Sequence, residues 1–201
     1  METVFYVVLG YFCGSILFAR LNAKIFDKPE IITQSPDGNP GTFNAFAYGG
    51  FLCGVLTLIG DLAKGYLPVM LYMRRTGVLL PEGLPLVLAA PVVGHAFPLF
   101  HRLRGGKGIA VTFGCLLGLT PWFHSVWFLA FWFVFFSLIV KVSPNMHRTF
   151  ITYLFTALTL AVAAPHRIAL GFAITAVVVT ARLVLSPEEK EKWSVVPIWK
   201  R

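Results

Sequence analysis

The chain has 201 residues, of which 57% are hydrophobic and 13% charged, with a mean hydropathy of +0.74 and a formal net charge of +8. A soluble domain carries about 25% charged residues and about 45–50% apolar ones, so this composition excludes an ordinary soluble fold. The apolar runs are continuous and do not alternate with polar residues, which predicts an all-α membrane protein.

Seven apolar segments are expected to be transmembrane helices within a single integral membrane domain that covers residues 1–201. A span needs about 20 apolar residues to cross the hydrocarbon core. The segment 108–120 is short for this, so we expect a short or tilted helix that breaks at Pro121. The N-terminal run has no preceding basic region and is predicted to be a retained helix. The seven segments are 3–19, 46–73, 83–100, 108–120, 122–140, 149–164 and 166–181.

Basic residues in the loops decide the span count and the orientation, because Lys and Arg are retained in cytoplasmic loops. With seven spans and the N-terminus outside, thirteen Lys and Arg residues lie in the cytoplasm. Three lie outside, and Lys64 lies within a span. Joining 108–140 into one helix would divide them seven against nine. The sequence therefore predicts seven spans with a cytoplasmic C-terminus. Topology accounts for the positive charge, and no nucleic-acid partner is expected.

The first cytoplasmic loop, residues 20–45, is long and contains Asp37, Asn39, Gly41 and Asn44. Asn and Asp between Gly and Pro residues are typical of tight turns. Alternatively, a long loop of this kind is often functional, and its side-chain amides could contact a polar substrate.

The second predicted span contains Asp61 and Lys64. Their i, i+3 spacing places both on one helix face, and ionisable residues within a membrane are usually paired. We therefore expect a structural ion pair, with a proton or ion path as the alternative. In the first span, Gly14 and Ser15 predict close packing against a neighbouring helix.

The residues from Arg104 to Gly108 have the composition of a phosphate-binding turn. We expect Gly105 and Gly106 to adopt positive φ, so that successive N–H groups point into one concavity. A helix that begins near Gly108 would add its unpaired N–H groups, and Arg104 and Lys107 would add charge. The alternative is a turn at the membrane interface whose cations extend to lipid headgroups.

His95 lies shortly before this turn, either as a packing residue or as a base. The three cysteines lie in separate apolar segments without metal-ligand spacing, so neither a metal site nor a cofactor is expected. A zinc-protease motif is absent.

Taken together, these motifs resemble those of the bacterial acyl-phosphate:glycerol-3-phosphate acyltransferase family. That family carries Gly-His-x-x-Pro-x-Phe followed by Lys-Gly-Gly-Lys-Gly, and has seven spans with the N-terminus outside. The order and spacing of the matches cover most of positions 11–145. The matching segments are Gly14–Ile16, Gly38–Asn44, Asp61–Gly65, Gly94–Phe100 and Arg104–Gly108.

The resemblance implies transfer of a fatty acyl group from acyl phosphate to glycerol 3-phosphate, forming lysophosphatidate for phospholipid biosynthesis in the bacterial inner membrane. Its implied partners are the two substrates, the lipid bilayer and an enzyme that forms acyl phosphate. The candidate catalytic residues are Lys107, His95 and Asp37. The candidate substrate- or phosphate-binding residues are Arg104, Gly105, Gly106, Gly108, Asn39, Gly41, Asn44, Ser143 and Arg182.

The chain departs from the family mainly in the parts that contact the acceptor. Asp37 stands where the family has Ser, Ala47 where it has Arg, and the C-terminal motif is reduced to Ala181–Leu183. A carboxylate repels an anionic acceptor, and Arg is a bidentate phosphate partner. Three other functions therefore stay open. They are an acyltransferase with a less anionic acceptor for which Asp37 is the base, a non-catalytic relative that binds lipid or a partner, and a transporter. The transporter is disfavoured because no repeated halves are found. The candidates to replace the missing cation are Arg20, Arg148 and Arg182.

Overall fold

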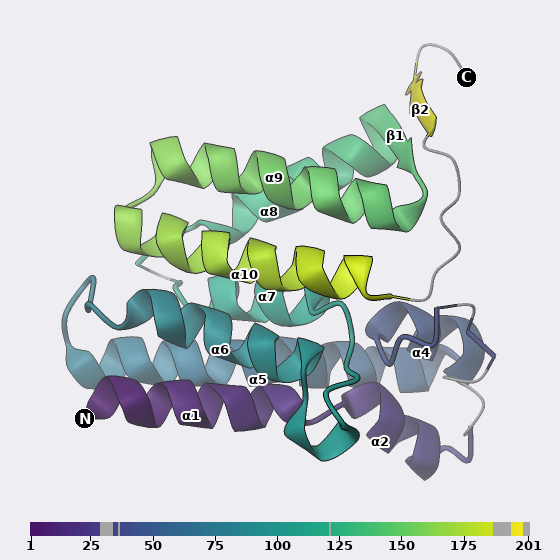
Figure 1. Cartoon of the computed structure of the whole chain (residues 1–201), viewed down its shortest axis with the longest axis horizontal. Helices are drawn as coiled ribbons and strands as arrows, with labels where there is room; N and C mark the ends of the chain where they lie inside the picture. The colour runs from purple at the N-terminus through teal and green to yellow at the C-terminus, as the bar shows by residue number, and fades with distance from the viewer. Residues whose placement is uncertain (29–33, 36, 121, 187–193, 199–201) are drawn as a thin grey trace.

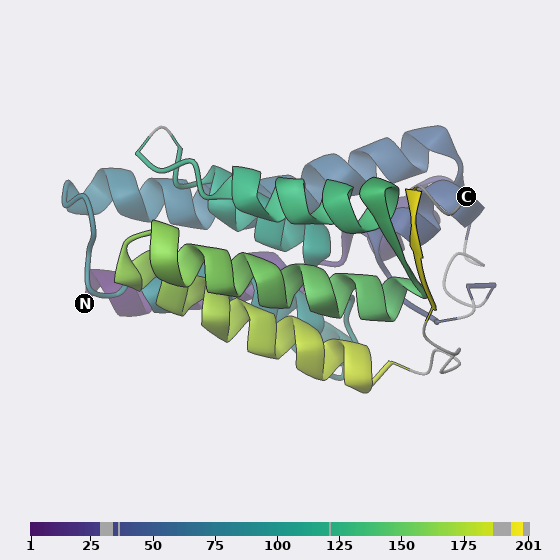
Figure 2. The ribbon, with the colours of Figure 1, turned by 90° about the horizontal axis from the view of Figure 1, so that it is seen from above.

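The computed structural model of the chain describes residues 1–28, 34–35, 37–120, 122–186 and 194–198. It is built mostly of helices whose axes run roughly in one direction (Figures 1 and 2). The helices are α1 (Glu2–Ser15), α2 (Phe18–Ile25), α4 (Thr42–Gly49), α5 (Phe51–Thr76), α6 (Leu84–Ala96), η1 (Leu99–His101), α7 (Ile109–Leu117), α8 (Val126–Val134), η2 (Phe135–Ile139), α9 (Asn145–Ala163) and α10 (His166–Val184), and the strands are β1 (Val140–Ser143) and β2 (Ser194–Pro197).

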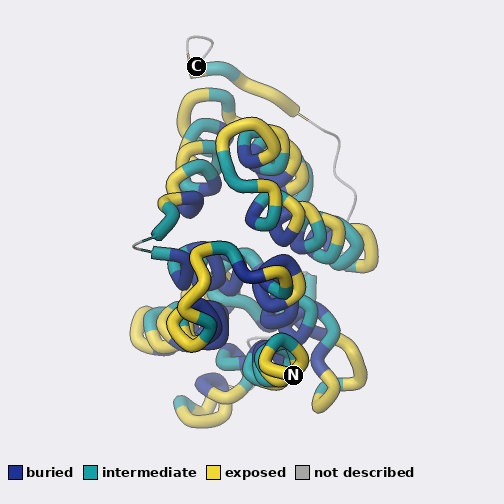
Figure 3. Tube along the Cα trace, turned by 90° about the vertical axis from the view of Figure 1, so that its left-hand side faces the viewer, coloured by how far each residue is buried: buried dark blue, intermediate teal, exposed yellow. Residues whose placement is uncertain are grey.

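Helix α6 lies at the centre of the bundle, between α1 and α10. Helix α5 packs against α1 and α7, while α9 packs against α10 and α8 at the opposite edge. Viewed along the helices, buried positions face inward and exposed ones face outward (Figure 3). The largest buried cluster joins α5, α6, α7, α9 and α10 into one core.

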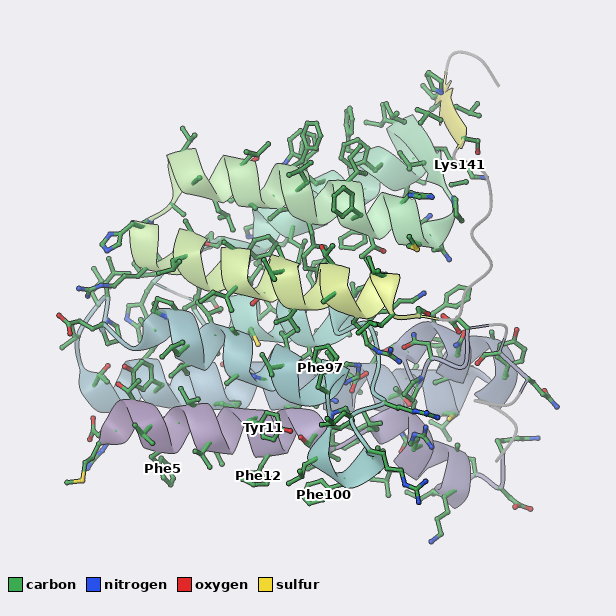
Figure 4. All side chains as sticks on the ribbon, viewed as in Figure 1. Phe5, Tyr11, Phe12, Phe97, Phe100 and Lys141 are labelled. Atoms are coloured by element: carbon green, nitrogen blue, oxygen red, sulfur yellow. The ribbon has the colours of Figure 1, made fainter. Side chains whose placement is uncertain are left out.

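Four helical segments of the described residues are long and apolar enough to cross a membrane: Glu2–Ile25, Phe51–Thr76, Leu84–His101 and His166–Val184. Large apolar side chains also cover the outside of the bundle. Figure 4 shows Phe5, Phe12 and Phe100 along one outer face, and their side chains are 61%, 42% and 63% exposed. Soluble monomers rarely expose contiguous apolar patches this extensive. The chain is therefore a mostly helical, multi-pass membrane protein.

Several expected spans differ in the structure, among them 46–73, where Gly50 separates α4 from α5, and 122–140, where α8 continues into η2 and β1. The segment 3–19 contains two helices, because the chain is extended at Ile16 and Leu17 between α1 and α2. The segment 108–120 contains α7, which has only nine residues. At 1.5 Å per residue it rises about 14 Å, too little to cross the hydrocarbon core by itself. Pro121, the expected break, lies outside the described residues.

Close contacts at glycines hold the helices together. A Cβ at Gly14 would lie 2.1 Å from the carbonyl oxygen of Pro91, and one at Gly94 would lie 2.1 Å from that of Tyr11, so α1 and α6 touch through their backbones. A Cβ at Gly114 would lie 2.1 Å from the Leu62 carbonyl oxygen, so α7 approaches α5 in the same way. Small residues permit this packing where no hydrophobic effect drives helix association.

The polar parts of the chain gather at one end of the bundle. Helices α2 and α4 lie at the end opposite the N-terminus (Figure 1), together with the antiparallel pair of β1 and β2, and Lys141 of β1 marks this end in Figure 4. The candidate site residues of the first loop and of the glycine-rich turn also lie there, because the turn joins α6 to α7 and contacts the first loop.

Candidate functional site

A cavity of about 790 Å³ opens between the first loop, α4, α5, α7, α8 and the start of α9. Small-molecule sites have volumes of about 300–1,000 Å³, so it can hold an amphiphilic ligand. One part of its wall is polar and the other apolar. The polar residues are Asp37, Asn39, Thr42, Asn44, Tyr48, Asp61, His95, Lys107, Asn145, Arg148 and Thr149, and the larger apolar ones are Phe43, Leu58, Leu62, Ile109, Phe113, Leu117, Val126, Trp127 and Phe133.

Asp37 connects the first loop to the glycine-rich turn. Its Oδ1 accepts hydrogen bonds from the Asn39 N–H (3.1 Å) and the Asn44 side-chain amide (2.7 Å), and its Oδ2 lies 3.0 Å from Lys107 Nζ. The Lys107 N–H in turn donates to Asn39 Oδ1 at 3.2 Å. Two segments 68 residues apart in sequence are thereby held in one arrangement, and the charge of Lys107 is compensated by a carboxylate of the chain itself.

The environment of Asp37 favours its ionised form. Burial raises its pKa, but hydrogen bonds from Asn44 and Lys107, the charge of Lys107 and the Asn39 N–H outweigh burial, so the pKa of Asp37 lies below its ordinary value. Asp37 is therefore a carboxylate at neutral pH, and the ion pair with Lys107 persists there.

The glycine-rich turn differs from the expected phosphate nest. The N–H groups of Gly105 and Gly106 donate to the carbonyl oxygens of Ala96 and His95, at 3.2 and 3.0 Å, and so do not point into a free concavity. Both glycines are required by close approach, since a Cβ would lie 1.8 Å from the His95 carbonyl oxygen at Gly105 and 2.3 Å from His95 Nε2 at Gly106. The positive φ, 78°, is at Gly108, immediately before α7.

The anion-binding capacity of the turn therefore lies at the start of α7. Gly108, Ile109 and Ala110 line the cavity, and no acceptor among the described residues takes their N–H groups. Unpaired N–H groups and the helix dipole favour an anion at such a position. Two further helices, α4 and α9, also begin at the cavity wall. Three helix N-termini consequently bring partial positive charge to one volume.

Asp61, Lys64 and His95 form a buried network behind this wall. Lys64 Nζ lies 2.8 Å from Asp61 Oδ1 and 2.8 Å from His95 Nδ1, and donates to the Ile16 carbonyl oxygen at 2.6 Å. The break between α1 and α2 makes that carbonyl available, and the contact of Lys64 with Asp61 Oδ1 is an ion pair, since this oxygen has no hydrogen-bond partner among the described residues. With Nδ1 occupied as an acceptor, the hydrogen of a neutral His95 ring is on Nε2, the nitrogen that faces Gly106.

Of the remaining predicted residues, Arg182, Arg104 and Ser143 lie outside the cavity wall and Gly41 lies on it. Arg182 of α10 donates from Nε and one terminal nitrogen to the Gly105 carbonyl oxygen, at 3.0 and 2.8 Å, and so fixes the turn from behind. Arg104 is exposed, and Ser143 pairs with Ser194 between β1 and β2. Gly41 lines the cavity at the start of α4.

Several lining residues were not among the predicted site residues. Thr42 donates to Asp61 Oδ2 at 3.3 Å, and Asn145, Arg148 and Thr149 come from the first two turns of α9. Their sequence signal is weak, although Arg148 is one of the three basic residues considered as a replacement for the family arginine. Among the described residues, no three His, Cys, Asp or Glu side chains gather as metal ligands would.

Comparison with known proteins places these features in a family. The family model for glycerol-3-phosphate acyltransferase matches residues 4–186. A glycerol-3-phosphate acyltransferase of Methylobacillus flagellatus is 41% identical over 122 residues, which are 60% of this chain and 60% of that protein. One of Pseudomonas fluorescens is 41% identical over 114 residues, 57% of this chain and 59% of that protein. The matches thus span about 60% of the length of these relatives.

Two crystal structures share the fold. They are the lysophosphatidic acid and glycerol 3-phosphate forms of PlsY, an integral membrane glycerol 3-phosphate acyltransferase, with TM-scores of 0.76 and 0.77. Each is 24% identical in sequence, and the match covers 90% of this chain and 88% of that protein. The family model covers far more than half of the chain and agrees with the shared fold, and the chain therefore belongs to the glycerol-3-phosphate acyltransferase family.

Proposed function

We propose that the chain transfers a fatty acyl group from acyl phosphate to the 1-hydroxyl of glycerol 3-phosphate. The observation that carries this proposal is the single cavity that combines an anion-binding end with an apolar wall. An acyl phosphate has the same two parts, and family membership supports the reaction.

In this proposal the acyl phosphate follows α7. Its phosphate lies at Lys107 and the free N–H groups of Gly108, Ile109 and Ala110, where the helix dipole favours negative charge. Its acyl chain lies against Phe113 and Leu117, which follow Ile109 along the same helix and line the cavity. The chain and its headgroup are thereby accommodated by one element.

The chemistry needs little more than positioning. The acceptor hydroxyl attacks the acyl carbonyl carbon, the bond from that carbon to the phosphate oxygen breaks, and the hydroxyl proton leaves with the phosphate. Because the phosphate is a good leaving group, orientation and charge stabilisation supply most of the rate. Lys107 stabilises the charge on the departing phosphate. His95, with its hydrogen on Nε2, acts as a donor toward the turn and not as a base.

The same proposal includes the arrangement in the membrane. The chain forms one domain with seven spans, the N-terminus outside and the site in the cytoplasm, and it belongs to a bacterial inner membrane. The basic residues support this orientation, since most of them fall in the loops assigned to the cytoplasmic side. An enzyme that forms acyl phosphate would then deliver the donor to this face.

A second acceptor is favoured by one observation. Asp37 already compensates Lys107 at 3.0 Å, and a carboxylate there disfavours a phosphorylated acceptor. A less anionic polyol would gain a hydrogen-bond acceptor from Asp37 instead. Restoring the family residue with Asp37→Ser distinguishes the two: a rise in glycerol 3-phosphate use together with a fall in polyol use would show that the acceptor has changed.

Phosphate release by the purified protein, supplied with acyl phosphate and glycerol 3-phosphate, tests the reaction. We expect release that requires both substrates and that falls at least 100-fold in Lys107→Ala, because a stabilising charge at the reacting centre is worth about 10²–10³ in rate. Lys141→Ala, an exposed cation of β1, should behave as wild type. Release that survives Lys107→Ala would remove Lys107 from the phosphate site.

Lys107→Ala also leaves Asp37 without its cation. The double variant Lys107→Ala, Asp37→Ser separates these effects, because it lacks both charges. We expect it to stay far below wild type, which assigns the loss to the missing ammonium. Acyl-phosphate binding without turnover for any of a panel of polyol acceptors would instead identify a non-catalytic relative.

A further inference from the structure

Two cations in or beside the cavity have a carboxylate partner, and a third has none among the described residues. Asp37 faces Lys107 at 3.0 Å, and Asp61 faces Lys64 of the same helix at 2.8 Å. Arg148 also lines the cavity, and no carboxylate of the described residues lies within ion-pair distance of it. The uncompensated positive charge of the cavity is therefore located at Arg148.

The guanidinium of Arg148 is held by one hydrogen bond, but one of its buried donors has no acceptor among the described residues. One terminal nitrogen donates to Asn145 Oδ1 in the same helical turn, while Nε is shielded from solvent and has no hydrogen-bond partner among the described residues. A buried donor without an acceptor costs free energy. The first-turn N–H groups of α9 add partial positive charge beside it. The start of α9 thus lacks an anionic acceptor of hydrogen bonds.

The reaction joins two phosphorylated substrates, so the cavity needs two anion subsites. The start of α7 continues into Phe113 and Leu117 along the cavity, which suits a phosphate that carries an acyl chain. Helix α9 contributes only Asn145, Arg148 and Thr149, all in its first two turns. A subsite with polar residues and no apolar continuation suits a short polar molecule.

We propose that Arg148 binds the phosphate of glycerol 3-phosphate and that α9, not the first loop, selects the phosphorylated acceptor in this chain. The inference rests on the proposed function. Asp37 strengthens it, because its carboxylate disfavours a second phosphate at the Lys107 end of the cavity. The guanidinium supplies the bidentate geometry that a phosphate accepts.

Steady-state kinetics with each substrate varied test this assignment in purified Arg148→Ala and Arg148→Lys. We expect Arg148→Ala to raise the KM for glycerol 3-phosphate tenfold or more and to leave the KM for acyl phosphate unchanged. The KM of Arg148→Lys for glycerol 3-phosphate should lie between those of Arg148→Ala and wild type, since lysine keeps the charge but cannot make the bidentate contact. With glycerol, which has no phosphate, the two variants and wild type should react equally. Arg102→Ala, an exposed cation outside the cavity wall, is the matched control.

Calorimetric titration of glycerol 3-phosphate into the detergent-solubilised protein gives a readout that does not depend on turnover. We expect wild type to bind and Arg148→Ala to bind at least tenfold more weakly. Equal binding by the two, or an equal rise in both KM values, would overturn the assignment. If wild type binds glycerol 3-phosphate but releases no phosphate, the proposed reaction fails while the titration still decides the role of Arg148. If Arg148→Ala does not fold, Arg148→Lys serves in its place, because it keeps the positive charge. An Arg148→Lys protein that binds glycerol 3-phosphate as tightly as wild type would reject the bidentate contact.

Discussion

Asp37 sets how much positive charge the cavity presents to a substrate. Its carboxylate takes hydrogen bonds from Asn39 and Asn44 and compensates Lys107, so the loop is ordered by an anion that belongs to the chain. In the proposed function, an incoming phosphate competes with this carboxylate for Lys107. In this proposal, Asp37 links the order of the first loop to the affinity for the donor.

Asp37→Asn tests this competition, because the amide keeps an oxygen for the Asn39 and Asn44 hydrogen bonds but loses the charge. We expect the KM for acyl phosphate to fall about three- to tenfold, since a partly exposed ion pair is worth on the order of 1 kcal/mol. Initial rates at varied acyl phosphate measure it. Glu82→Gln, an exposed carboxylate 93% accessible in its side chain, should have no effect. An unchanged KM in Asp37→Asn would show that the carboxylate does not compete.

The pH dependence of stability follows from the pKa of Asp37. Because the pKa is lower in the folded chain than in the unfolded one, the stabilisation is complete above the ordinary pKa and is lost as pH falls through the lowered value. Thermal unfolding of wild type and Asp37→Asn should therefore differ by a constant amount between about pH 5 and pH 8, and converge below about pH 4. A difference that changes near neutral pH would contradict the ionised state assigned to Asp37.

Candidate residues for the site were easier to name from the sequence than the contacts that they make. Composition and motif single out Gly105, Gly106 and Lys107 as candidates, but the partners of their backbone groups lie on other elements, and of the three only Lys107 lines the cavity. No local pattern indicates that Ala96 and His95 accept the two glycine N–H groups. The pairing of Asp37 with Lys107 depends on a loop and a turn meeting in space, and spacing in sequence carries no information about that.

Among the elements, α1 and α6 depend most directly on backbone contact. Gly14→Leu places a side chain against the Pro91 carbonyl, 2.1 Å from where its Cβ would lie. Overpacking of this kind costs about 1–3 kcal/mol, so we expect a lower midpoint of thermal unfolding in detergent. Val8→Leu, on the exposed face of the same helix, should leave the midpoint unchanged. Equal midpoints in the two variants would mean that α1 can move away from α6 without cost.

Helix α8 forms part of the apolar wall through Val126, Trp127, Ala130 and Phe133. Ala130→Leu fills part of the acyl-chain volume, and one methylene too many in an apolar pocket costs about 1–3 kcal/mol. We expect kcat/KM for the longest accepted acyl phosphate to fall about tenfold or more, while short chains react as before. Phe131→Leu, which changes an exposed side chain of the same helix, is the control. Loss of rate that is equal for all chain lengths would place the acyl chain elsewhere.

Helix positions were predictable from apolar runs, whereas helix ends were not. The segments near α5, α6 and α10 were located because their hydrophobicity is continuous. The break at Ile16 and Leu17 falls within an apolar run, and the Ile16 carbonyl oxygen at the break accepts a hydrogen bond from Lys64. That partner is 48 residues away, beyond any local pattern.

For the whole molecule, the proposal depends on orientation: the site and most basic loops should lie on the cytoplasmic side of the membrane. Single cysteines at two exposed arginines test it: Arg74→Cys at the end of α5, and Arg102→Cys after η1. An impermeant maleimide should label Arg74→Cys in intact cells and Arg102→Cys only after lysis. The unsubstituted chain, whose three cysteines are buried or half-buried, measures background labelling. Labelling of both variants in intact cells would contradict the proposed orientation.

In the proposed function, the apolar part of the cavity, between α7 and α8, also determines which concentration of acyl phosphate governs the rate. A single-chain amphiphile partitions into the bilayer, so it reaches Phe113 and Ala130 by lateral diffusion and not from solution. Velocity should consequently follow the mole fraction of acyl phosphate in the vesicle or micelle, and diluting the surface with inert lipid should slow turnover at constant bulk concentration. Glycerol 3-phosphate arrives from the water, and its saturation should depend on bulk concentration alone. One cavity would thus receive acyl phosphate by diffusion within the membrane and glycerol 3-phosphate by diffusion from the water.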